Sequence, residues 1–321
     1  MSDIMTVGYV QSAMQTLLFA SKNLEETQQR TSSGLQVEKA SDNAGYWSAA
    51  TSMTSDQSVL GSIGDALNLG ASKVDTSYEA VTSAIDILDE INGNLITASE
   101  AGTDRDALNS TISALKENLN SVLQAATFSG DNWLYNNDDV LGTSNSIPTS
   151  FQRSVSGAVS LSYVSVATAD TTLIDSVDAD RGLLTRSIDA NSLNSDGTTT
   201  ARNYYLLDVG STTPSAGEAI SISDTTTQSE LDDMIAVVGY VTDKLNQLAS
   251  SLGTVSARIE QQSTFVASLQ DVLDEGVGRL VDADMEEEST KLAAYQTQQS
   301  LSAELLSMLN SHQQSARVLF G

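Results

Sequence analysis

The chain has 321 residues, of which 42 are acidic and 15 are basic, so its formal net charge is −27. This excess of acid disfavours nucleic acid as a partner, because phosphate binding needs a footprint of lysine and arginine, and it equally disfavours an anionic membrane surface. The sequence has no cysteine and a single histidine, His312. Disulfides, thiolate metal sites, a cysteine nucleophile and most histidine-based catalysis are therefore excluded.

The first residues do not have the pattern of a secretory signal. The segment Met1–Gly8 lacks a basic start, a continuous apolar core and a small-residue cleavage site, so we expect no cleaved signal peptide. No run of 18 apolar residues occurs, so we expect no membrane-spanning helix. Export by a dedicated apparatus that reads other signals stays open.

Residues 1 to about 135 show helical periodicity. Apolar side chains recur in steps of three and four along one helix face: Val7, Val10, Met14, Leu17 and Leu24. Gly34 is expected to end this helix in the left-handed conformation, although the segment Arg30–Gly34 is also compatible with an anion-binding loop. A second helical face runs from Leu60 to Leu95 and includes Tyr78, Ile85 and Asn92. A third helix is expected to begin at a cap on Thr103 or Asp104 and to end near Phe128.

Residues from about 230 to 321 give the clearest helical pattern. Steps of three and four continue without a break from Leu231 to Leu273, and a repeat of 3.5 residues over six heptads predicts a packed helical partner. Gly276 and Gly278 are expected to interrupt this helix. A final helix is expected from about Asp284, with two adjacent apolar rows that need partners on more than one side. Leu301, Leu305 and Met308 form one row, and Leu306 and Leu309 form the other.

The middle of the chain, residues 136–229, differs in composition. It is rich in serine, threonine, aspartate and glycine and has no lysine. Segments 158–166 and 204–209 have the composition of strands, and turn signals at 194–197 and 212–215 bound them. We predict a mainly α fold in which both chain ends form a long antiparallel helical coiled-coil bundle, with a small β-rich inserted outer domain. The alternative is that the insertion is a disordered linker.

The sequence shows few signs of chemistry. The carboxylates between Asp282 and Glu288 have a spacing similar to a calcium loop, but Glu287 stands where that loop requires glycine. We interpret them as the acidic start of the last helix. There is no dinucleotide loop, Walker loop or nucleophile elbow. We therefore expect no metal, no cofactor and no enzymatic activity, with His312 at a surface or interface.

Both ends of the chain resemble bacterial flagellins. The segment Gln28–Ala44 is similar to the N-terminal block of that family, and the segment Val281–Glu288 is similar to the motif that opens its last helix. Residues 296–301 and 318–321 resemble its C-terminal tail, and residues 44–53 look most like flagellins of rhizobial bacteria. The family motif residues are Gln29, Arg30, Ser32, Ser33, Gly34, Asp42, Asn43, Asp284 and Glu288.

The resemblance implies a structural subunit that polymerises into the flagellar filament for swimming motility. It implies terminal helices at the filament centre (residues 1–40 with 285–321), a surrounding helical wall (41–135 with 230–284) and an exposed β-rich insertion (136–229). The implied partners are further copies of the chain, sister flagellins, the flagellar cap, the hook-associated junction proteins and an export chaperone on the C-terminal helix. The implied location is the extracellular flagellum, reached by type III export without a cleaved signal.

The residues expected at the polymerisation interface are apolar and lie on the two terminal helices: Val7, Val10, Met14, Leu17, Leu24, Leu301, Leu305, Leu306, Met308 and Leu309. The nearest alternative function is the hook–filament junction protein, which shares these helices. Two other classes are a coiled-coil signalling or adhesin protein and an enzyme within the insertion. The matching terminal blocks oppose the former, and the insertion's lack of histidine and lysine opposes the latter.

Overall fold

The structure is a computed structural model that describes residues 2–154, 157–193 and 202–320, and side chains are described within residues 8–311 of these ranges. Two compact units are present, which we call the terminal unit (Met1–Ser58 with Leu269–Gly321) and the central unit (Val59–Ser268). The helices are α1 (Ser2–Ser33), α2 (Ala44–Ala98), α3 (Arg105–Ala125), α4 (Thr168–Thr171), α5 (Gln228–Val281) and α6 (Met285–Phe320). The strands are β1 (Tyr135–Asn136), β2 (Ser144–Arg153), β3 (Val159–Ala167), β4 (Ile174–Asp175), β5 (Ile188–Asp189), β6 (Asn203–Tyr205) and β7 (Glu218–Ala219).

The helix boundaries follow local sequence signals. Gly34 adopts a φ of 74° directly after α1 and donates its backbone N–H to the Arg30 carbonyl at 2.8 Å, which confirms the predicted end of that helix. The Asp104 carboxylate accepts from the Ala107 N–H at 3.0 Å and caps α3, as predicted. The predicted break at Gly276 and Gly278 is wrong, because α5 continues to Val281. A glycine costs an established helix only about 1 kcal/mol relative to alanine, so packing overrides it.

In the central unit, α2 and α5 run antiparallel. Asp75 accepts a hydrogen bond from Ser256 at 3.1 Å, and Arg105, just beyond the end of α2, donates to the Thr226 carbonyl at 2.6 Å just before α5 begins. The buried α5 positions match the predicted face from Leu231 to Val266. On α2 the predicted face is wrong at three positions, because Ser77, Ala84 and Ile91 are buried in place of Tyr78, Ile85 and Asn92.

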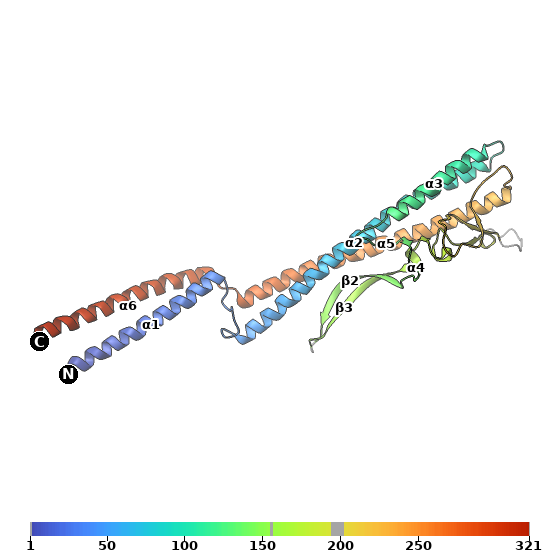
Figure 1. The fold of residues 1–321 in the computed structure, drawn as a ribbon. Helices are drawn as coiled ribbons and strands as arrows, with labels where there is room; N and C mark the ends of the chain where they lie inside the picture. The colour runs from blue at the N-terminus through green and yellow to red at the C-terminus, as the bar shows by residue number, and fades with distance from the viewer. Residues whose placement is uncertain (1, 155–156, 194–201, 321) are drawn as a thin grey trace. The chain divides into compact units, whose positions relative to one another are not determined.

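The insertion is built of small sheets, so the prediction of strands there is confirmed for its described residues. Strands β2 and β3 form an antiparallel hairpin with a bulge between Pro148 and Ser150. Strands β1 and β4 pair in parallel, and β6 pairs antiparallel with β5 and parallel with β7. The turn signal predicted at 194–197 lies outside the described residues. Figure 1 shows the hairpin beside the α2 and α5 helices.

A close approach at Gly70 fixes the hairpin to α2. A Cβ atom added to Gly70 would lie 2.6 Å from the Ile147 Cγ2 atom and 2.8 Å from its Cδ1 atom. Ile147 is 4% exposed, and Val164 and Val166 of β3 are also buried. The inner face of the hairpin therefore packs on a position of α2 where there is room for hydrogen only.

Side chains of α3 hold the chain segment that leads from the insertion into α5. The Lys116 ammonium donates to the Ile220 carbonyl, and the Asn109 side-chain oxygen accepts from the Ile222 N–H at 3.0 Å. Arg105, at the start of α3, donates to the Thr226 carbonyl. Burial lowers the pKa of Lys116 from 10.5 to about 8. Side chains of α3 thus form hydrogen bonds with backbone groups of a segment that has few sheet hydrogen bonds of its own.

Candidate assembly surface

Helices α1 and α6 of the terminal unit pack along their length, and Figure 1 shows them side by side. We call the line of contact the seam. Its residues on α1 recur in steps of three and four: Val10, Ala13, Leu17, Ala20, Leu24 and Thr27 are buried or half-buried. On α6 the equivalent positions are Glu288, Leu292, Tyr295, Gln299, Ser302, Leu306 and Leu309. Gln299 donates to the Ser21 hydroxyl at 3.1 Å across the seam.

Large apolar side chains remain uncovered on both helices. Apart from Met285 at the first position of α6, their exposed fractions run from 46% to 67%: Tyr9, Met14, Leu18 and Phe19 on α1, and Leu301, Leu305 and Met308 on α6. At 100° per residue, Leu18 and Phe19 lie on the side of α1 opposite the seam. Leu301, Leu305 and Met308 form a row on α6 that is turned away from the seam. We call these seven residues the outward apolar rows.

The predicted interface residues therefore divide into two groups. Leu24 is buried in the seam, and Val10, Leu17, Leu306 and Leu309 are half-buried along it. Met14, Leu301, Leu305 and Met308 are exposed, and the side chain of Val7 lies outside the described residues, as does that of His312. Tyr9, Leu18 and Phe19 were not predicted. The run Leu17–Phe19 was a usable signal, because three consecutive apolar residues cannot all lie on one face of a helix.

The backbone connects α1 and α6 again where both helices meet the rest of the terminal unit. Leu35 and Asp282 form an antiparallel bridge, and the Ala283 N–H donates to the Gly34 carbonyl at 2.9 Å. Val37, Ala50 and Val281 form a small buried core beside it. We call this region, residues 29–43 with 281–291, the junction.

Most of the family motif residues shape the junction. The Asn43 side chain accepts from the Gly45 and Tyr46 N–H groups at 3.1 Å and caps α2, and Asp284 accepts from the Glu286 N–H at 3.0 Å and caps α6. The Asp42 carboxylate accepts from the Glu38 and Lys39 N–H groups at 3.2 Å.

The remaining motif residues contribute side-chain contacts. Gln29 donates to the Glu38 carboxylate at 2.6 Å, and Ser33 accepts from the Leu35 N–H at 3.2 Å. Ser32 is exposed. An anion-binding loop at Arg30–Gly34 is disfavoured by this geometry, because these groups form the end of a helix.

Two regions of the sequence match models of a known protein family. The bacterial flagellin N-terminal helical region matches residues 4–139, and the bacterial flagellin C-terminal helical region matches residues 235–319. Flagellin C of Rhizobium meliloti (strain 1021) is 48% identical over 320 residues, which cover 100% of this chain and 99% of that protein. The chain belongs to the bacterial flagellin family.

Two further flagellins match this chain along its whole length. Flagellin A of Rhizobium meliloti (strain 1021) is 35% identical and covers 100% of both chains, and a flagellin of Brucella melitensis biotype 1 is 34% identical over 100% of this chain and 99% of its own. The crystal structure of Bacillus cereus flagellin is similar over 64% of this chain and 88% of that chain, with 17% identity and a TM-score of 0.37. This flagellin is thus a structural subunit that self-assembles into the extracellular flagellar filament. The hook–filament junction alternative receives no better support.

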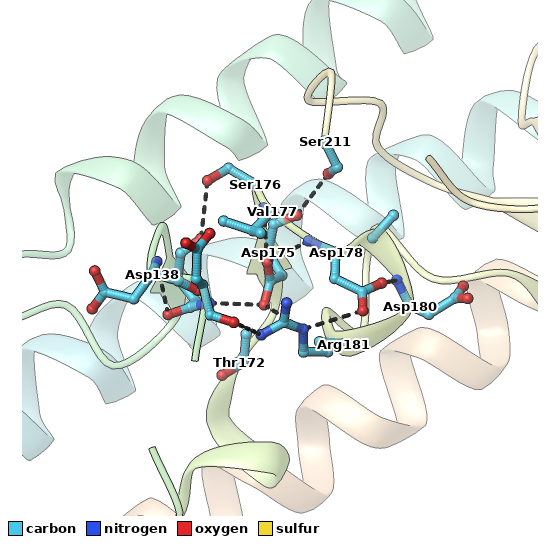
Figure 2. Close-up of polar contacts among 12 residues, drawn as sticks. Asp138, Thr172, Asp175, Ser176, Val177, Asp178, Asp180, Arg181 and Ser211 are labelled. Carbon is cyan, nitrogen blue, oxygen red and sulfur yellow. Dashed lines mark hydrogen bonds and ion pairs between the residues drawn. The ribbon is translucent and has the colours of Figure 1, made fainter. Parts of the chain in front are cut away.

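The insertion of this flagellin contains a buried ion pair (Figure 2). Asp175 is 0% exposed, and its carboxylate accepts from the Val177 and Asp178 N–H groups at 2.8 Å. Arg181 lies 3.6 Å from Asp175 and 3.3 Å from Asp178. The carboxylates of this cluster bind nearby backbone N–H groups or the Arg181 guanidinium, so we interpret the cluster as structural. Within the described residues, no group of three or more acidic, histidine or cysteine side chains is placed to hold a metal.

The described helices also show no membrane-spanning candidate, because none is both long enough and apolar enough. A hollow in the central unit holds about 400 Å³ and is lined by polar groups, among them Asp131, Asn132 and Asn136. Asn132 and Asn136 already bond to neighbouring backbone groups. We assign no catalytic role to this hollow.

Proposed function

We propose that the outward apolar rows of α1 and α6 are the surface through which this flagellin polymerises. The single observation that carries the proposal is the exposure of seven large apolar side chains on two helices that already pack together. Large apolar side chains that are exposed together on neighbouring helices are typical of interaction sites. The wider predicted set, which includes Val7 and the seam residues, stays a prediction.

The energetics favour assembly with many neighbours at once. Fully burying a large apolar side chain contributes roughly 1.5–3 kcal/mol, so covering the exposed half of each of these residues contributes about half of that. Most of the stability of a helix in a protein comes from packing of its apolar face and not from intrinsic helix propensity. Contacts that do not close on themselves generate a helical filament, and within it every added copy covers the rows of its neighbours.

The test is seeded elongation with single variants. Phe19→Ser is expected to raise the critical concentration for elongation about tenfold, because the side chain opposite the seam loses its apolar contact with a neighbour. Val140→Ser is the matched control, because Val140 is 81% exposed but lies in the central unit. If both variants elongate from seeds like the unaltered chain, the outward rows are not the assembly surface.

Removing the chain ends gives a coarser test. A truncated chain lacking residues 1–30 and 300–321 is expected to fail in polymerisation while α2, α3 and α5 stay folded, as circular dichroism would show. The support is that residues 1–30 and 300–321 belong to the terminal unit, whereas α3 and most of α2 and α5 belong to the central unit. Filaments formed by the truncated chain would contradict the proposal.

Further roles follow from family membership and remain proposals. We infer three radial layers in the filament: residues 1–40 with 285–321 innermost, 41–135 with 230–284 around them, and 136–229 outermost. We also infer type III export and contacts with sister flagellins, the cap and the hook-associated junction proteins. The outward row of α6 suits an export chaperone, which would cover Leu301, Leu305 and Met308 before assembly. We infer no enzymatic activity, because the insertion has no histidine or lysine and one glutamate, Glu218.

A further inference from the structure

The two carboxylate oxygens of Glu288 differ in their hydrogen bonding. Glu288 lies in the first turn of α6 and is 3% exposed. Its Oε1 atom accepts from the Lys291 ammonium at 3.0 Å. Its Oε2 atom is buried and has no hydrogen-bond partner among the described residues. Burying a charged acceptor without a donor is unfavourable, so this oxygen is a place where the free chain is incompletely stabilised.

A suitable donor stands close by on the other helix. Arg30, in the last turn of α1, holds its Nη1 atom 3.8 Å from the Glu288 Oε1 atom, and the Arg30 side chain is 38% exposed. This separation is too long for a hydrogen bond. A guanidinium has five N–H donors in a planar fork that matches both oxygens of one carboxylate at about 2.7–2.9 Å. A relative movement of about 1 Å therefore separates the observed loose ion pair from a two-pronged one.

The Arg30 side chain is able to make such a movement. The seam itself mixes short side chains, such as Ala13 and Ser302, with larger ones, such as Leu24 and Leu306. The movement does not require the helices to slide, because the Arg30 side chain is long, rotatable and 38% exposed. Seven further large apolar side chains lie outside the seam, in the outward apolar rows.

We propose that Arg30 and Glu288 form a latch that is open in the free chain and closes on assembly. When sister copies cover the outward rows, α1 and α6 are pressed together, and the Arg30 guanidinium closes on both Glu288 oxygens. Closure ties the end of α1 to the start of α6, beside the backbone bridge at Leu35 and Asp282. Arg30 is thus a positioning residue of the filament. This proposal rests on assembly through the outward rows, and its tests are chosen to be separable from that.

The direct test is geometric. In a filament reconstruction at side-chain resolution, two Arg30 nitrogens are expected within hydrogen-bond distance of the two Glu288 oxygens. In the free chain, nitrogen-15 NMR of the Arg30 guanidinium is expected to show the exchange rate of a loosely held group. A filament in which Arg30 faces solvent, or remains as far from Glu288 as in the free chain, would overturn the latch.

Variants give an independent test. Arg30→Lys keeps the charge but loses the fork, and it is expected to raise the critical concentration for elongation about tenfold, or ~1.4 kcal/mol, without changing the helix content or melting temperature of the free chain. Lys22→Gln is the matched control on α1, because it removes the exposed Lys22–Glu26 pair, which contributes little. If Arg30→Lys elongates like the control, the latch is refuted. If Phe19→Ser elongates like the unaltered chain, the assembly surface is refuted instead.

Discussion

The contact between Gly70 and Ile147 predicts that alanine at position 70 will destabilise α2, whereas alanine at an unhindered glycine of the same helix will stabilise it. Replacing glycine by alanine inside an established helix stabilises it by about 1 kcal/mol. At Gly70, however, the new methyl group would lie 2.6 Å from one Ile147 carbon and 2.8 Å from another. Forcing extra atoms into a packed site costs about 1–3 kcal/mol. We expect Gly70→Ala to destabilise the central unit by up to about 2 kcal/mol.

A comparison series isolates the cause. Gly93→Ala, on an exposed turn of the same helix with no atom near the added methyl, is expected to stabilise by about 1 kcal/mol. Ile147→Ala removes all three carbons that the Gly70 methyl would meet, so Gly70→Ala is expected to become stabilising in that background. Ile147→Val removes only the Cδ1 carbon and is expected to fall between.

Urea unfolding followed by circular dichroism measures each free energy, and the double-mutant cycle gives the coupling. The melting temperature should move by about 2–4 °C per kcal/mol for a unit of this size. If Gly70→Ala stabilises the chain as much as Gly93→Ala does, the hairpin does not pack on α2 at this point, and the placement of β2 is wrong.

Three further predictions concern buried and capping groups. Burial lowers the pKa of Lys116 to about 8 in the folded chain, so the unfolded chain binds more protons than the folded chain between about pH 8 and 10.5. The free energy of unfolding should therefore rise by about 1–2 kcal/mol from about pH 8 to about pH 9.5. Urea titrations of Lys116→Met at these two pH values should show no such rise. Asp104→Ala removes the cap of α3 and should cost about 1 kcal/mol in the same assay. Asp175→Ala leaves the Val177 and Asp178 N–H groups without their buried acceptor, while Arg181 keeps Asp178, and it should cost about 1–3 kcal/mol, visible as a lower melting temperature.

Helix ends were predictable from the sequence because their causes are local. Gly34, Asp104 and Asp284 each satisfy or terminate backbone groups within four residues, so the residue type alone carries the information. The same reasoning would have found the start of α5. Thr227 and Glu230 exchange hydrogen bonds between side chain and backbone, which is the capping box that a threonine followed three residues later by a glutamate indicates. That contact lowers the pKa of Glu230.

The face of α2 was less predictable, since burial there depends on the partner and not on the residue. Ser77 and Ala84 are buried although Tyr78 and Ile85 are more apolar, because steps of three and four from Leu60 bring the smaller residues to the facing helix. The parallel pairs β1–β4 and β6–β7 join segments that carry no short-range signal, so no periodicity indicates them. The sequence predicted part of the outward apolar rows. Which apolar residues lie in the seam and which face outward could be seen only in the structure.

The division of large apolar side chains between the seam and the outward apolar rows also explains why assembly and folding of the terminal helices should be linked. Where the two helices meet, pairing within one chain buries Leu24 and leaves Leu17, Leu306 and Leu309 half-buried. Other large side chains, among them Leu18, Phe19 and Leu301, are turned outward. Because hydrophobic stabilisation scales with the apolar area buried, a further part of what these helices can gain is available only beside other copies. Each subunit that joins a filament should therefore stabilise the terminal helices it touches.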